Sequence, residues 1–107
     1  MNTAEIRRDT SIARAAARAD RECPKWTDTA FETLVTYCHI YGPGHEFHCE
    51  SLRERAEAHG VVPEPSDGRA WGHVFRRAAR AGLIRKTGRY VLAKSSNLSP
   101  KPVWEVL

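Results

Sequence analysis

The stretch DGRAWGHVFRRAARAGLI, residues 67–84, has the periodicity of an α-helix with one apolar side. Residues three or four positions apart fall on the same side of a helix. That side must be buried against other elements, because a lone amphipathic helix cannot cover it. We therefore expect this helix to lie against the core, with five residues facing inward: Trp71, Val74, Phe75, Ala78 and Gly82.

The opposite side of the same helix is cationic. No acidic residue stands between Arg69 and Ile84 to form the usual i, i+4 ion pairs, so the arginines are expected to repel one another and to face water. An ordinary solvated helix face would carry charges of both signs. A face of one sign instead predicts an anionic partner. The residues of this face are Arg69, His73, Arg76 and Arg80, with Arg77 at its edge.

Gly72 interrupts this helix with a residue that costs about 1 kcal/mol relative to alanine. A close approach by another element would explain the glycine, and the second helix of the domain is the expected neighbour. Approach of a DNA backbone is the alternative. The aromatic residues Trp71, Phe75 and Trp104 are expected to anchor the core rather than to stack on bases.

Residues 3–22 favour helix through alanine, arginine and glutamate, but Ile6 and Ile12 are their only large apolar side chains. Such a helix docks weakly through Ile6, Ala13 and Ala17, lies against a partner, or frays. We therefore divide the chain into an N-terminal helical segment, residues 1–24, and a domain of residues 25–107. The N-terminal segment is a candidate surface for a homodimer.

Two further helices are expected before the cationic one. The first, in WTDTAFETLVTYCHIYG, has Thr27 as its N-cap, an apolar face and Gly42 after its end. GPGHEF then breaks the chain, and HCESLRERAEAHG forms a shorter helix with Leu52 and Ala56 inward. VVPEPSDG is a loop in which Ser66 or Asp67 caps the cationic helix. The apolar face of the first of these helices is formed by Phe31, Leu34, Val35 and Cys38.

After Gly82 the pattern changes from helical to extended. LIRKTGRYVLAK is rich in β-branched and aromatic residues, and KPVWEVL alternates Trp104 and Val106 with Glu105. SSNLSP between them is polar and prone to turns. The C-terminal third is therefore predicted to form a β-hairpin.

Helix, helix, cationic helix and hairpin is the order of a winged helix-turn-helix domain. RAWGHVFRRAARAGLIRKTGRY followed by PVWEV resembles a group of small phage and prophage winged-helix proteins, closely over residues 69–90 and loosely over residues 31–104. The expected fold is thus α+β, a winged helix-turn-helix with a three-helix core, a C-terminal hairpin wing and an extra N-terminal helix. The resemblance implies binding of double-stranded DNA, as a transcription regulator or as an accessory protein in DNA transactions.

In such a fold the cationic helix would enter the major groove and the wing would lie on the backbone. The alternative is a winged-helix module that binds a protein without contacting DNA, and lysines on the hairpin could simply protect an edge strand. The predicted DNA-binding residues are first Arg69, Arg76 and Arg80, then His73 and Arg77 on the helix, and Lys86, Arg89, Lys94 and Lys101 on the wing.

Composition supports this class without proving it. The 107 residues suit one small core, and the formal net charge of +4 favours acidic partners. Three cysteines at unrelated spacings favour reduced thiols in the cytoplasm, and we find neither a secretory signal nor a membrane span. No spacing typical of a zinc site, a phosphate loop or a nucleophile appears, so we expect no metal, no cofactor and no enzymatic activity.

Overall fold

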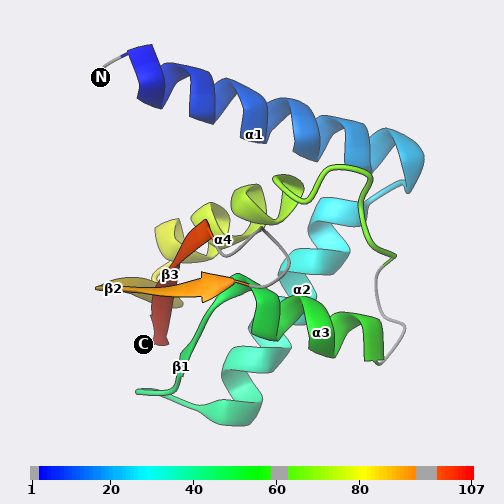
Figure 1. Ribbon diagram of the computed structural model, residues 1–107. Helices are drawn as coiled ribbons and strands as arrows, with labels where there is room; N and C mark the ends of the chain where they lie inside the picture. Colours follow the sequence, from blue (N-terminus) through cyan, green and yellow to red (C-terminus); the bar gives the residue numbers. More distant parts are fainter. Residues whose placement is uncertain (1–2, 59–62, 94–98) are drawn as a thin grey trace.

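The computed structural model describes residues 3–58, 63–93 and 99–107, and the predicted wing residue Lys94 lies outside these ranges. Within them the chain forms four α-helices and a three-stranded antiparallel sheet (Figure 1), so the expected α+β class is confirmed. The helices are α1 (Thr3–Glu22), α2 (Trp26–Tyr41), α3 (Cys49–Ala58) and α4 (Ala70–Arg80). The strands are β1 (Glu46–Phe47), β2 (Ile84–Ala93) and β3 (Ser99–Val106).

The predicted C-terminal hairpin is present, and β3 is the central strand of the sheet, between β1 and β2. Sequence analysis missed β1, which follows the Gly-Pro-Gly break and contains only two residues. The amide of Val106 donates to the carbonyl of His45 at 2.9 Å, which holds this short strand against the hairpin. A strand so short leaves no alternating pattern in the sequence.

The core lies between α2, α4 and the sheet. The rings of Trp26 and Trp71 meet edge to face with 5.1 Å between their centroids, and the Phe75 ring centroid lies 5.5 Å from that of Trp104. Trp71, Phe75 and Trp104 are all buried, which confirms their predicted role as core anchors.

The end of α4 corrects the position of one predicted core residue. Gly82 does not face the core but follows the helix with a φ of 77°. The amide of Leu83 donates to the Ala78 carbonyl and that of Gly82 to the Ala79 carbonyl. This is the Schellman arrangement, which requires the left-handed conformation that glycine adopts without strain. Gly82 therefore ends α4 and starts the turn into β2.

The junction of α1 and α2 is held by Asp20. Its carboxylate accepts hydrogen bonds from the Thr27 amide at 2.9 Å and from the Thr27 hydroxyl at 3.0 Å. Thr27 is therefore inside the first turn of α2 and is not its N-cap, which is Lys25. A carboxylate from α1 satisfies a free amide of α2, as a capping side chain would.

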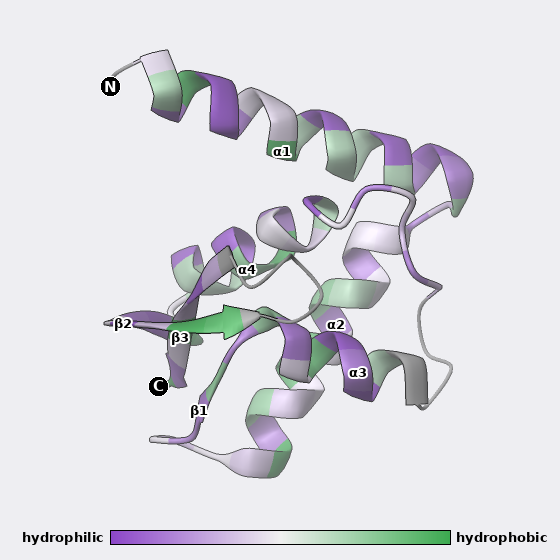
Figure 2. Cartoon of the chain, viewed as in Figure 1, coloured by the Kyte–Doolittle hydropathy of each residue, from purple (hydrophilic) through white to green (hydrophobic). Residues whose placement is uncertain are grey.

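Helix α1 packs along α4 (Figure 1), and its contacts differ from those expected. The buried residues of α1 are Ala15, Ala16 and Ala19, whereas Ile6 is 51% exposed. Gly72 is the point of close approach, since a Cβ atom there would lie 3.3 Å from Cδ1 of Ile12. Gly72 thus packs against α1, not against the second helix of the predicted domain. Hydrophilic residues cover much of the remaining surface of α1 (Figure 2).

Candidate nucleic-acid interface

A cleft of about 860 Å³ lies between α1, α3, α4 and the hairpin. Its apolar lining includes Ile12 from α1, Phe75 from α4 and Trp104 from β3. The amino group of Lys86 lies 5.6 Å from the centroid of the Trp104 ring. The cleft therefore combines an aromatic lining with positive charge.

Cationic side chains from every neighbouring element line this cleft. Helix α1 contributes one, α3 one, α4 and the residue before it two, and the hairpin two. Among the described residues, only two acidic side chains, Glu50 and Asp67, line it as well. The cationic residues are Arg8, Arg53, Arg69, Arg76, Lys86 and Lys101.

The cationic stripe predicted on α4 is largely neutralised by carboxylates from elsewhere in the chain. Arg76 pairs with Asp9 of α1 at 2.7 Å, and Arg77 pairs with Asp28 of α2 at 2.8 Å. The guanidinium of Arg77 also lies 4.1 Å from the centroid of the Phe31 ring. The expectation of unpaired, mutually repelling arginines is therefore wrong for Arg76 and Arg77, because their partner acids are distant in sequence. Arg77 is nevertheless exposed, as expected.

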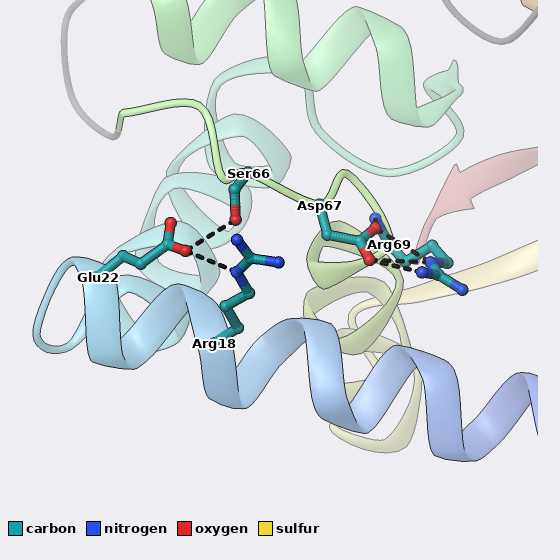
Figure 3. Close-up of polar contacts among 5 residues, drawn as sticks. All are labelled: Arg18, Glu22, Ser66, Asp67 and Arg69. Atoms are coloured by element: carbon teal, nitrogen blue, oxygen red, sulfur yellow. Dashed lines mark hydrogen bonds and ion pairs between the residues drawn. The ribbon is translucent and has the colours of Figure 1, made fainter.

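Arg69 is paired within its own turn. Its side chain bonds the Asp67 carboxylate at 2.7 Å, and its amide donates to the same carboxylate at 3.0 Å (Figure 3). These hydrogen bonds from Arg69 hold the pKa of Asp67 below its usual range. The N-cap of α4 is Arg69, which has no side-chain capping hydrogen bond, so the prediction that Ser66 or Asp67 caps this helix is wrong. Asp67 instead positions the chain just before α4 by accepting a hydrogen bond from the Arg69 amide.

Ser66, the other predicted cap, binds α1 instead. Its hydroxyl donates to the Glu22 carboxylate at 3.0 Å, and the same carboxylate accepts a 2.7 Å hydrogen bond from Arg18 (Figure 3). These two hydrogen bonds, the one from Arg18 first, lower the pKa of Glu22. The contact ties the end of α1 to the segment that leads into α4.

Of the nine predicted DNA-binding residues, four line the cleft and four of the others lie elsewhere on the described surface. The cleft contains Arg69, Arg76, Lys86 and Lys101. Arg80 is exposed on α4, and His73 is half-buried there. Arg89 pairs with Glu46 of β1.

Among the cationic and exposed aromatic residues of the cleft, three were not predicted from the sequence: Arg8, Arg53 and Tyr90. Arg8, Ser11 and Ile12 stand at i, i+3 and i+4 on α1, a spacing that puts them on one side of the helix. That spacing could have marked the inner side of α1. Its few large apolar side chains instead suggested a separate segment.

The histidine and cysteine cluster of residues 38–49 forms ordinary structural contacts. His45 shares a 2.9 Å hydrogen bond with the Tyr37 hydroxyl and stacks on Tyr41. Burial raises the pKa of the Cys49 thiol to about 11, so the protonated thiol predominates near neutral pH. Across the described ranges, no three His, Cys, Asp or Glu side chains are grouped closely enough to hold a metal ion.

The structure thus defines an α+β domain with a cationic cleft. None of its helices in the described ranges has the length and hydropathy needed to cross a membrane. Comparison of the chain with protein-family models, with curated proteins and with solved structures finds no match. The resemblance to phage winged-helix proteins, the cytoplasmic location and the homodimer therefore stay predictions.

Proposed function

We propose that this protein is a winged-helix protein that binds DNA through the phosphate backbone. In this interpretation α3 and α4 are the helix-turn-helix pair, the hairpin is the wing, and α1 is an added helix. The observation that carries the proposal is the convergence of six cationic side chains from four parts of the fold on one cleft. Phosphates are the ligands that such a surface favours, because each contact releases condensed counterions.

The packing of α1 bears on how DNA would be contacted. Helix α1 packs against α4 at Gly72 and pairs with Arg76, so it covers the side of α4 that carries these two residues. That side cannot enter a groove while α1 stays in place, whereas Arg77 and Arg80 remain exposed on α4. With α1 in place, the backbone is contacted by the cations around the cleft.

The cations best suited to phosphate are those without an ion pair among the described residues. Arg8, Lys86 and Lys101 line the cleft and have no carboxylate partner in the part of the chain that the structure describes. A phosphate at these side chains need not displace a carboxylate, whereas at Arg69 or Arg76 it must compete with Asp67 or Asp9.

The test is binding of fluorescently labelled DNA, as duplex and as single strand, over a series of salt concentrations. Replacing Arg8, Lys86 or Lys101 by alanine should weaken binding and reduce the slope of log K against log salt by about 0.7–0.9 for each phosphate that the variant no longer neutralises. Arg14→Ala is the matched control, because Arg14 is exposed on α1 but does not line the cleft. Absence of binding at low salt, or equal slopes for cleft and control variants, would refute the proposal.

The alternative, a winged-helix module that binds a protein, predicts a different response in the same assay. Apolar docking depends weakly on salt. If DNA binding is absent while the chain remains folded, this alternative becomes the preferred function.

A further inference from the structure

The inner face of the hairpin continues from the core into the cleft. Trp104 pairs with Lys86, Pro102 with Tyr90 and Pro100 with Leu92. Side chains of directly opposed residues lie on the same face of an antiparallel pair, and alternate residues of one strand share a face. Tyr90 and Leu92 therefore lie on the face of Trp104, and the end of β2 is visibly hydrophobic (Figure 2).

This face is open where it leaves the core. Trp104 is 7% exposed, whereas Tyr90 is 62% and Leu92 is 65% exposed. Tyr90 forms no hydrogen bond, ring contact or cation–π contact with any residue in the described ranges. Single exposed apolar side chains need no explanation. Tyr90, however, lines the cationic cleft, whereas Leu92 does not.

Positive charge surrounds the exposed ring. Tyr90 lines the cleft together with Arg8, Arg69, Lys86 and Lys101, which come from α1, the residue before α4 and both strands of the hairpin. Proteins that bind single-stranded nucleic acid combine a cationic groove with aromatic side chains on which bases stack. The same combination is present here within one cleft.

The position of the ring favours an unpaired base over a base pair. Ile12 of α1 and Gly72 of α4 line the same cleft as Tyr90, so α1 forms part of the wall of the space beside the ring. The cleft volume of about 860 Å³ is in the range of sites that enclose a small ligand. A duplex can contact its rim, but the bases of a duplex are stacked and paired and present no free face to Tyr90.

We infer that the cleft takes one unpaired strand of nucleic acid, with a base stacked on Tyr90 and the flanking phosphates at Arg8, Lys86 and Lys101. The inference rests on the proposed function and specifies its ligand. Stacking is tolerant of sequence, because every base has a π-face. The site should therefore accept a homopolymer such as oligothymidylate.

The test compares labelled oligothymidylate with a duplex of the same length at low salt, by fluorescence anisotropy. The wild-type protein should bind the single strand more tightly. Tyr90→Ala should weaken single-strand binding by about 5- to 150-fold, the equivalent of one base stack. Tyr90→Phe should keep most of the affinity, because it retains the ring.

Leu92→Ala is the matched control, since it removes an equally exposed apolar side chain from the same face of the hairpin. It should bind oligothymidylate like the wild type, and thermal unfolding of all variants should confirm that they are folded. Tighter binding of duplex, with Tyr90→Ala as active as the wild type, would overturn the inference and leave the proposed function intact. Loss of all nucleic-acid binding would refute both.

Discussion

The packing of α1 on α4 can be tested at Gly72 of α4, where Ile12 of α1 lies close to the helix backbone. Gly72 has room for little more than hydrogen, because an added Cβ would lie 3.3 Å from Cδ1, 3.5 Å from Cγ1 and 3.6 Å from Cγ2 of Ile12. Carbon atoms prefer separations of about 3.5–4.0 Å. Alanine at position 72 would therefore force the Ile12 side chain to shift by a few tenths of an ångström.

Two opposing effects decide the outcome of Gly72→Ala. Alanine in a helix interior stabilises by about 1 kcal/mol relative to glycine. Forcing Ile12 away from its preferred rotamer costs about 0.5–1.5 kcal/mol. When Ile12 is present these two effects nearly cancel, so Gly72→Ala should change the free energy of unfolding by close to zero.

The Ile12→Ala substitution removes the side-chain atoms that an alanine at position 72 would contact. In that background, Gly72→Ala should raise the free energy of unfolding by the full 1 kcal/mol or so. The coupling between the two positions is then about 0.5–1.5 kcal/mol, which urea unfolding of the four proteins can resolve. If Gly72→Ala stabilises both backgrounds equally, Ile12 does not pack on Gly72 and α1 does not lie along α4.

Three further outcomes are expected. Asp9→Asn should raise affinity for DNA at low salt by up to about fivefold, because it frees Arg76 from an exposed ion pair; unchanged affinity would exclude Arg76 from the interface. Asp20→Ala should lower the free energy of unfolding by about 0.5–2 kcal/mol, because the Thr27 amide loses its acceptor; an unchanged urea midpoint would contradict this capping role. Cys49 is half-buried beside the cleft, and desolvation raises its pKa to about 11, so it should react with iodoacetamide near pH 8 about tenfold more slowly than in urea; equal rates would contradict the raised pKa. Since the unfolded thiol ionises first as pH rises, stability should also fall between about pH 8.5 and 11, which thermal unfolding can follow.

Periodicity alone was sufficient for the elements with strong patterns. The inward residues Trp71, Val74, Phe75 and Ala78 were predicted from helical spacing and are all buried. The hairpin followed from the change to an extended pattern after Gly82. In both elements the hydrophobic residues recur with the repeat of the helix or of the strand, so the local sequence is sufficient to predict the type of secondary structure.

The position of α1 could not be derived in the same way. Its buried surface consists of alanines, which are small enough to let two helices approach but do not stand out among the other alanines of the segment. Ile6, the larger side chain, is exposed. Of the two isoleucines, only Ile12 packs against α4, so hydrophobic size alone did not identify the contact. The glycine at position 72 indicated a close approach, but its sequence context does not identify the neighbouring helix.

The net charge exposed on α4 also could not be predicted from the helix sequence alone, because some of its arginines pair with acids that are distant in sequence. A helix sequence reveals pairs at i, i+4, but Asp9 and Asp28 reach Arg76 and Arg77 only because α1 and α2 pack beside α4. Once these pairs form, the arginines that looked most available compete with internal carboxylates for any phosphate. Arg8 and Lys101, on elements that seemed peripheral, have no such competitor in the described ranges. The surface that we propose binds DNA therefore depends on how α1 closes over α4, and the cationic helix α4 supplies only part of its charge.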